Sequence, residues 1–310
     1  MGERPKIIII TGPTGSGKTE IGIECAKRFN GEIVSADSMQ IYKGLNIGTA
    51  KPNARQLEEV PHHLIDIAEP NSKFNVFNYK QLALTSINDI LNRNKVPIVV
   101  GGTGLYIRSI IQNLSFGGIG NHKSETREKY QNLLDKHGSE YLYNLLQRAD
   151  PEAARLIHIN NTQRVMRALE ICETKGKNKG LSQDEQEEKF DYIMFVLDLP
   201  REQLYAHINK RFGDMIELGL VQEVKNLIKN KEVTRDSSSM QAIGYKELFD
   251  YIDQKITLDD YIETASRHSR NYAKRQLTFF RGFKKAIFLD PSTQKKEIFE
   301  KIKEFLGEKI

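Results

Sequence analysis

The fold of this chain is decided by the stretch Lys6-Ile-Ile-Ile-Ile-Thr-Gly12-Pro-Thr-Gly-Ser-Gly-Lys18-Thr19. Its opening run up to Ile10 is short and apolar, which is typical of a strand buried on both faces. The part from Gly12 matches the pattern GxxxxGK[ST]. An amphipathic helical pattern follows at once, from Glu20 to Phe29. Strand, glycine-rich loop and helix in this order predict a loop that binds phosphate groups.

The residue types of this loop suit a diphosphate or polyphosphate. Glycines let backbone N–H groups turn inward, and the N-terminus of the following helix adds the positive end of its dipole. Lys18 supplies a point charge, and the Thr19 hydroxyl can hold Mg²⁺. The loop alone leaves open whether the ligand is ATP, GTP or another diphosphate ester. The residues expected to bind the diphosphate are Gly12, Pro13, Thr14, Gly15, Ser16, Gly17, Lys18 and Thr19.

Further short apolar runs predict a parallel sheet. They are Glu32 to Ser35, Pro97 to Val100 and Tyr192 to Leu197, and a helical pattern from Phe77 to Leu91 lies between the first two of them. Strands that alternate with helices are the signature of crossover connections. We therefore expect an α/β fold, a P-loop NTPase-like parallel sheet with flanking helices.

A polar, helix-prone segment interrupts this alternation. We expect residues 117–188 to form a helical insertion, and residues 1–116 and 189–310 to form the α/β core with C-terminal helices. The helical patterns lie at Glu125 to Leu146, Pro151 to Thr174, Arg201 to Met215, Val221 to Lys229, Tyr261 to Arg281 and Lys295 to Phe305.

The composition narrows the class of protein. The chain has 310 residues, 39% hydrophobic and 28% charged, without a run near the roughly 18 apolar residues of a membrane span. We expect no membrane segment, a cytoplasmic location and a monomer. Cys25 and Cys172 stand alone, so neither a disulfide framework nor a zinc site is expected. The histidines His62 and His63 are expected to be structural. The net charge of +5 is compatible with nucleic-acid binding but decides nothing alone.

An aspartate follows the second predicted strand. Asp37 should lie at the edge of the sheet where ligands bind and should face the phosphate loop. It could hold Mg²⁺ through water, accept a proton from an attacking atom, or only cap the next turn. Asp198, at the end of the last predicted strand, competes for the metal role.

Several motifs in register carry a family resemblance. They are Asp37-Ser-Met-Gln-Ile-Tyr-Lys-Gly44, Ile47-Gly-Thr-Ala-Lys-Pro52, Pro61-His-His-Leu64, Gly101-Gly-Thr-Gly-Leu-Tyr106, Leu199-Pro-Arg-Glu202, Gln241-Ala-Ile-Gly-Tyr245 and Tyr272-Ala-Lys-Arg-Gln276. With these motifs and the phosphate loop, the chain resembles the bacterial tRNA isopentenyl transferases, also called tRNA dimethylallyltransferases, over nearly its whole length.

The resemblance implies a reaction. Dimethylallyl diphosphate would fill the phosphate loop with Mg²⁺, and its dimethylallyl group would move to N6 of the adenine on the 3′ side of the tRNA anticodon. Asp37 would accept the proton of the amine, and Lys18 would stabilise the leaving diphosphate. Thr103 would contact the diphosphate or the base, and Arg127 is the candidate for the family's arginine that reaches the diphosphate.

The target adenine must leave the anticodon loop to enter a buried site, so tRNA must be held from several sides. A predicted basic face on the helix from Tyr261 to Arg281 offers phosphate contacts, or is only a solvated surface. The residues expected to contact tRNA are Asp37, Ser38, Met39, Gln40, Thr103, Arg127, Asn161, Thr162, Gln163, Arg164, Val165, Gln241, Gly244, Tyr245, Lys246, Lys274 and Arg281.

Three alternatives stay open at this point. An isopentenyl transferase acting on free AMP or ADP would share the fold but would need neither the insertion at 117–188 nor a basic helix. A small-molecule kinase would place ATP in the loop, with Asp37 activating a hydroxyl, and would leave the later motifs unexplained. An RNA-binding module without activity would leave the phosphate loop without a purpose.

Overall fold

The computed structural model describes residues 4–112, 124–175 and 188–307. The chain divides into two compact units. The first combines Met1–Asn113 with Glu187–Ile310, and the second spans Leu114–Gln186, against the 117–188 expected from the sequence. Among the described residues, no helix is both long and apolar enough to cross a membrane.

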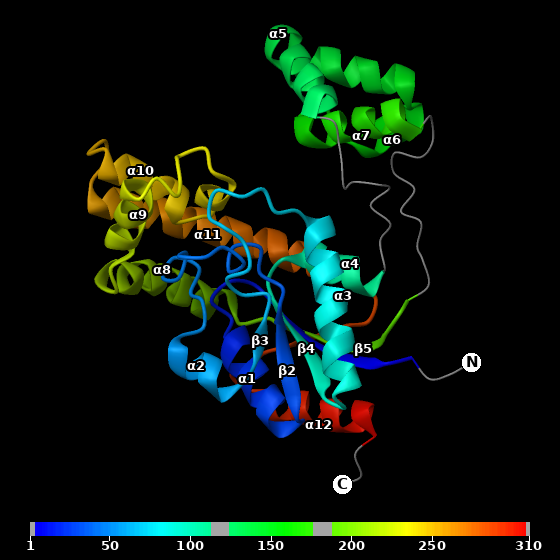
Figure 1. The fold of residues 1–310 in the computed structure, drawn as a ribbon, viewed down its shortest axis with the longest axis vertical. Coiled ribbons are helices and arrows are strands. Elements are labelled where there is room, and N and C mark those ends of the chain that lie inside the picture. Colours follow the sequence, from blue (N-terminus) through cyan, green and yellow to red (C-terminus); the bar gives the residue numbers. More distant parts are fainter. Residues whose placement is uncertain (1–3, 113–123, 176–187, 308–310) are drawn as a thin grey trace. The chain divides into compact units, whose positions relative to one another are not determined.

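A parallel sheet forms the centre of the first unit (Figure 1). Its six strands are ordered β3-β2-β4-β1-β5-β6, and every neighbouring pair is parallel. The predicted parallel sheet is confirmed. The strands are β1 (Lys6–Thr11), β2 (Gly31–Ser35), β3 (His62–His63), β4 (Val96–Gly101), β5 (Asp191–Leu197) and β6 (Ala286–Leu289).

The sequence patterns did not predict the two outer strands, for different reasons. β3 has only two residues, too few for any periodic signal. β6 is short and mostly half-buried at the sheet edge, so its apolar run resembles a loop that packs against the core. The central β1 shows the opposite situation, because its isoleucines from Ile7 to Ile10 are at most 1% exposed. Both faces of β1 are therefore covered.

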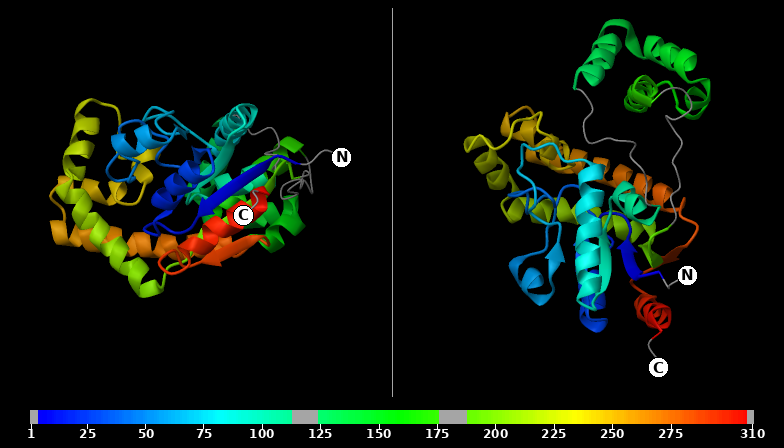
Figure 2. Two further views of the ribbon diagram at one scale, coloured as in Figure 1. Left: turned by 90° about the horizontal axis from the view of Figure 1, so that it is seen from below. Right: turned by 45° about the vertical axis from the view of Figure 1, so that its right-hand side comes forward.

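Helices from distant parts of the sequence cover the two faces of the sheet (Figures 1 and 2). On one face, α3 (Val76–Asn92) and α4 (Gly104–Ile111) pack against Ile7 and Ile9 of β1. On the other, α1 (Lys18–Arg28) and α12 (Lys295–Leu306) pack against Ile8 and Ile10. The short α2 (Ala54–Glu59) precedes β3. The alternation of β1 side chains thus builds two apolar cores.

A further group of helices adds a third apolar core to this unit. Tyr245 and Tyr261 are fully buried in it, and α8 and α11 lie side by side (Figure 2). Ala265, Ala273 and Phe280 form a buried apolar stripe on α11. The elements are α8 (Arg201–Glu217), α9 (Leu220–Lys229), the 3₁₀ turn η2 (Ser238–Gln241), α10 (Tyr245–Ile252) and α11 (Leu258–Phe280).

The second unit is a small helical domain with its own core, which includes Leu142, Leu146 and Met166. It contains α5 (Ser124–Ala149), kinked at Gly138, then α6 (Pro151–Leu156) and α7 (Thr162–Lys175). The helical pattern from Pro151 to Thr174 thus corresponds to two helices. The chain becomes extended at Ile157, and the Asn161 side chain accepts the Arg164 N–H to cap a new helix.

Candidate active site

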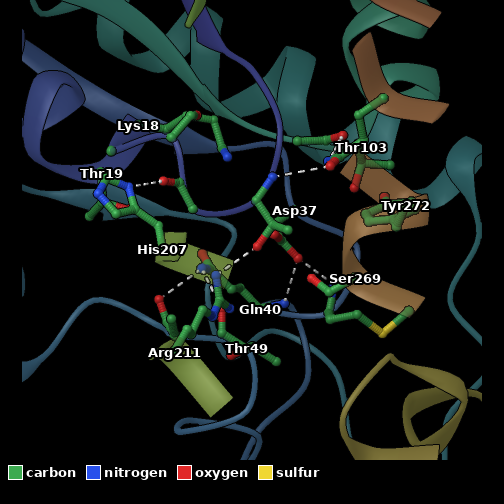
Figure 3. A pocket seen from close by; sticks show the side chains of 18 of the residues that line it. Lys18, Thr19, Asp37, Gln40, Thr49, Thr103, His207, Arg211, Ser269 and Tyr272 are labelled. Atoms are coloured by element: carbon green, nitrogen blue, oxygen red, sulfur yellow. Dashed lines mark hydrogen bonds between the residues drawn. The ribbon is translucent and has the colours of Figure 1, made fainter. Parts of the chain in front are cut away.

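A cavity of about 1010 Å³ lies in the first unit, at the carboxyl ends of the central strands. Ligands of open α/β sheets bind at this edge. The cavity wall contains the phosphate loop, the segment after β2, the loop at 48–51, the turn after β4 and side chains of α8 and α11. Figure 3 shows Lys18, Thr19, Asp37, Thr103, Arg211 and Tyr272 around it.

The phosphate loop has the backbone that its glycines were expected to allow. Gly15 and Gly17 have φ values of 81° and 80°, in the left-handed region that favours glycine. A Cβ on Gly12 would lie 2.6 Å from the Leu197 carbonyl oxygen. The helix α1 starts immediately after Gly17, which has no side chain to cap its first N–H groups. Those N–H groups are therefore available to an anion.

Lys18 is held at the cavity. Its Nζ donates to the Pro13 carbonyl at 2.7 Å. Burial lowers the pKa of the Lys18 ammonium to about 8, against an upward contribution from the Asp37 carboxylate. The ammonium is thus charged at neutral pH yet poorly hydrated, which strengthens its attraction for a phosphate.

Two side chains of α8 add to the phosphate loop, and the sequence motifs pointed to neither. Arg211 Nη1 donates to Thr14 Oγ1 at 2.7 Å, and burial lowers the pKa of this arginine. His207 Nδ1 lies 3.2 Å from the Gly15 carbonyl oxygen. Both residues lie almost 200 positions along the chain from the loop. Their spacing on a helix, four apart, was the only available signal.

Gln276 of α11 joins the phosphate loop to the turn after β4. Its Oε1 accepts the Thr14 N–H at 3.1 Å, and its Nε2 donates to the Gly102 carbonyl at 2.8 Å. A Cβ on Gly102 would lie 2.4 Å from that Nε2 atom, so the turn needs glycine there. The last motif of the family resemblance, which ends at Gln276, thus serves the phosphate loop directly.

Asp37 lies between Lys18 of the phosphate loop and the side chains of Thr103 and Tyr272 (Figure 3). Its Oδ1 accepts N–H groups from Met39 at 2.9 Å and from Gln40 at 3.3 Å. The carboxylate therefore caps the turn that follows it, one of the three roles considered, and also lines the cavity. A capped carboxylate has a fixed orientation, which suits a group that must meet a substrate proton.

Thr103 and Tyr272 form the wall opposite the phosphate loop. Thr103 Oγ1 accepts the Ser38 N–H at 3.0 Å and lies 3.3 Å from Ser38 Oγ. Burial raises the pKa of Tyr272 to about 12, helped by the charge of Asp37, so this phenol stays protonated at neutral pH. Thr103 was predicted at the site, whereas Tyr272 was expected only as part of a motif.

The residues predicted to contact tRNA from the first unit divide into two groups. Ser38, Met39, Gln40 and Gln241 line the cavity, and Lys246, Lys274 and Arg281 are exposed. Tyr245 is fully buried, and the Gly244 N–H donates to Glu247 Oε2 at 2.7 Å. The tRNA contact predicted for Tyr245 stays a prediction. Its aromatic ring belongs to the third core.

The predicted residues of the second unit surround the start of α7. Arg127 Nη2 donates to Gln163 Oε1 at 2.7 Å, and Arg127 Nη1 lies 3.6 Å from Glu170. Gln163 and Arg164 are exposed, and Thr162 is half-buried. Val165 is 1% exposed and packs in the core of this unit, and its tRNA contact stays a prediction. The catalytic role of Arg127 stays a prediction.

The remaining polar candidates are held in place by the fold. His62 Nδ1 lies 2.7 Å from the Val60 carbonyl oxygen, and His63 Nε2 lies 2.8 Å from Glu32 Oε2. These contacts fit the structural role expected for both histidines. Burial raises the pKa of Asp198, and the Arg281 guanidinium opposes that shift. A role of Asp198 in metal binding stays a prediction.

Comparisons with known proteins identify the family. A family model described as IPP transferase matches residues 40–283. The chain belongs to this family. It is 45% identical to the tRNA dimethylallyltransferase of Caldanaerobacter subterraneus subsp. tengcongensis, over 98% of each chain. It is also 45% identical to the tRNA dimethylallyltransferase of Bacillus subtilis, over 96% of each chain.

Solved structures of IPP transferases share the fold. The full-length tRNA isopentenylpyrophosphate transferase of Bacillus halodurans matches with a TM-score of 0.71 and 40% identity, over 98% of this chain and 96% of that one. A eukaryotic dimethylallyltransferase described as acting on tRNA matches with a TM-score of 0.83 and 30% identity, over 99% of this chain and 80% of that one. The resemblance inferred from the motifs is confirmed at the level of the family.

Proposed function

We propose that this chain transfers the dimethylallyl group of dimethylallyl diphosphate to N6 of the adenine on the 3′ side of the anticodon in tRNA, with release of diphosphate. The observation that carries the proposal is that cations and a carboxylate line one cavity. Lys18 and Arg211 stand at the phosphate loop, and Asp37 faces the acceptor side. A prenyl transfer needs a clamp for the leaving group and a base for the incoming amine.

The phosphate loop acts in this proposal as the clamp. When the bond between C1 of the prenyl group and the diphosphate oxygen breaks, its electron pair stays on oxygen and the negative charge grows. The first N–H groups of α1, the Lys18 ammonium and the Arg211 guanidinium meet that charge. Preformed donors in a partly buried site stabilise such charge without reorganising.

Asp37 acts as the base. N6 of adenine attacks C1, and the proton released from N6 passes to the carboxylate as the N–C bond forms. The N–H groups of Met39 and Gln40 fix the carboxylate during this step. Thr103 and Tyr272 offer hydroxyl groups at the wall where the base must be seated.

The donor atoms near Thr19 fit the proposed Mg²⁺. Thr19, Asp37, Ser35 and Gln40 line a smaller cavity of about 40 Å³, so hard oxygen donors gather there. The described residues hold no cluster of three His, Cys, Asp or Glu side chains fit for a metal ion. Thr19 would therefore hold Mg²⁺ together with substrate oxygens, while Asp37 serves as the base. When bound, the ion would neutralise charge on the diphosphate.

The tRNA is gripped outside the cavity in this proposal. The target adenine leaves its stack and enters the cavity past the cavity-lining Ser38, Met39 and Gln241. The exposed side chains of Gln163 and Arg164, the neighbouring Arg127, and the exposed Lys246, Lys274 and Arg281 are proposed to meet the anticodon arm. We place the enzyme in the cytoplasm, with its tRNA substrate, as a monomer.

The test is a transfer assay with three parallel arms. Dimethylallyl diphosphate labelled in the prenyl group is incubated with the protein, Mg²⁺ and either unmodified tRNA or AMP, and labelled ATP replaces the donor in the third arm. We expect label in tRNA, at N6 of the adenine beside the anticodon after nuclease digestion and mass spectrometry. Label in AMP instead, or transfer of the γ-phosphate of ATP, contradicts the proposal.

A further inference from the structure

The loop at residues 46–50 forms part of the cavity wall and is tied to two helices behind it. Glu223 of α9 accepts N–H groups from Asn46 at 3.0 Å and from Ile47 at 2.9 Å through Oε2. The other oxygen, Oε1, accepts the hydroxyl proton of Tyr245 at 2.6 Å. One carboxylate thus holds two consecutive backbone N–H groups and one phenol.

Tyr245 completes this clamp. The Gly48 N–H donates to the Tyr245 hydroxyl oxygen at 3.1 Å. Burial, together with the Glu223 carboxylate, raises the pKa of Tyr245 above its usual range, so the phenol keeps the proton that it donates to Glu223. A Cβ on Gly48 would lie 2.3 Å from the Tyr245 ring, so the loop lies directly on this ring. Three successive loop amides are therefore satisfied by two side chains.

The clamped loop is connected to the proposed base. Gln40 Nε2 donates to the carbonyl groups of Thr49 at 3.3 Å and Ala50 at 3.2 Å. The backbone N–H of the same Gln40 donates to Asp37 Oδ1 at 3.3 Å. The orientation of the carboxylate thus depends on Gln40, and the place of Gln40 depends on the loop.

We propose that Glu223 and Tyr245 are positioning residues for the transfer reaction: they fix the loop at 46–50 and thereby aim the Asp37 carboxylate at the acceptor amine. The inference rests on the function proposed above and deepens it. Glu223 and Tyr245 lie outside the phosphate loop and act only on the acceptor side of the cavity. The donor side is tied instead by Gln276 and Arg211.

The charge of Glu223 matters to this arrangement. A carboxylate accepts at both oxygens and binds N–H donors more strongly than a neutral group does. In Glu223→Gln one oxygen becomes an NH₂ group, which cannot accept from an N–H or a phenol. At least one loop amide or the Tyr245 hydroxyl then loses its partner. A displacement of about 1 Å at a reacting group costs on the order of 100-fold in rate.

The test compares Glu223→Gln, Tyr245→Phe and the double variant with Glu217→Gln, a nearby exposed glutamate of α8 that serves as the matched control. We expect Glu223→Gln to lower kcat for tRNA by about 10-fold to 100-fold. The Kd for dimethylallyl diphosphate should stay within about threefold of wild type, because the phosphate loop is untouched. Tyr245→Phe should cost less, and the double variant should resemble Glu223→Gln alone if the two residues act as one unit.

Amide hydrogen exchange provides a readout that does not depend on activity. Protection at Asn46, Ile47 and Gly48 should fall in Glu223→Gln and stay unchanged in Glu217→Gln. The clamp is contradicted if protection at these amides is unchanged, if kcat is unchanged, or if kcat and donor affinity fall together. A wild-type protein that transfers no label to tRNA would instead overturn the proposed function, whatever the exchange experiment shows.

Discussion

The diphosphate side of the cavity is built from backbone amides and cations, whereas the acceptor side is built from hydrogen bonds around one carboxylate. On the first side, Lys18 and Arg211 border a loop whose shape is set by glycines. On the second, Asp37 is held by Met39 and Gln40. The difference separates two tasks, because charge attracts the donor while orientation decides the rate of transfer.

The largest loss of donor binding should follow from breaking the diphosphate side at its centre. Lys18→Met removes a charge that acts both on the bound donor and on the leaving group. We expect the Kd for dimethylallyl diphosphate to rise, and kcat/KM for transfer to fall by about 100-fold to 1,000-fold. Lys210→Met, an exposed lysine of α8, is the control and should retain wild-type kinetics. Near-normal kinetics of Lys18→Met would remove the lysine from the clamp.

A smaller loss should follow from removing the cation of α8. Arg211→Met leaves Thr14 Oγ1 without its donor and takes one guanidinium from the loop. Hydrogen bonds to charged groups contribute about 1.5–3 kcal/mol, so the Kd for the donor should rise by about 10-fold to 100-fold. Titration calorimetry without tRNA measures this change directly. A Kd within twofold of wild type would show that Arg211 only supports the loop.

The pH dependence of donor affinity tests the diphosphate side separately. The pKa of Lys18 is lowered to about 8, so the ammonium is present below that pH and is lost as the pH rises through it. Donor affinity should therefore weaken above pH 8, by up to about tenfold for each further unit. In Lys18→Arg this dependence should disappear, because a guanidinium stays protonated throughout. An equal slope in both proteins would assign the titration to another group.

The smallest effect is expected on tRNA binding, through the basic face of α11. Lys274 and Arg281 are exposed, whereas Arg270 already donates to Asn209 at 2.5 Å. Replacing Lys274 and Arg281 by Gln should reduce the slope of log K for tRNA against log salt by about 0.7 to 0.9 for each phosphate that the variant no longer neutralises. Transfer at saturating tRNA should change little. An unchanged slope would make this face an ordinary solvated surface.

The contiguous motifs of the cavity could be predicted from the sequence, whereas their long-range partners could not. The phosphate loop is a contiguous motif, so its strand, glycines and helix could be read together, and Asp37 followed from its place at a strand end. Arg211 and Gln276 reach the same loop from 197 and 262 positions away, and no local pattern encodes such contacts. Long-range partners of a motif need the tertiary fold.

Two of the predicted tRNA contacts involve side chains that the fold buries. Tyr245 belongs to a recognisable motif, but its ring is fully buried and its hydroxyl serves Glu223 and Gly48. A sequence motif therefore does not show whether a side chain faces a ligand or the core. Val165 was grouped with its polar neighbours at a helix start, although its place on the inner face of α7 buries it.

The central claim is that Asp37 sets the rate of transfer while the phosphate loop sets donor binding. Asp37→Asn tests it most directly, because an amide oxygen can still accept the Met39 and Gln40 N–H groups but cannot take a proton from adenine. Single-turnover transfer to tRNA and donor Kd are measured on the same preparation. We predict a rate about 100-fold to 10,000-fold lower with a Kd within about threefold of wild type. A near-normal rate, or a loss of donor affinity that matches the loss of rate, would contradict the account.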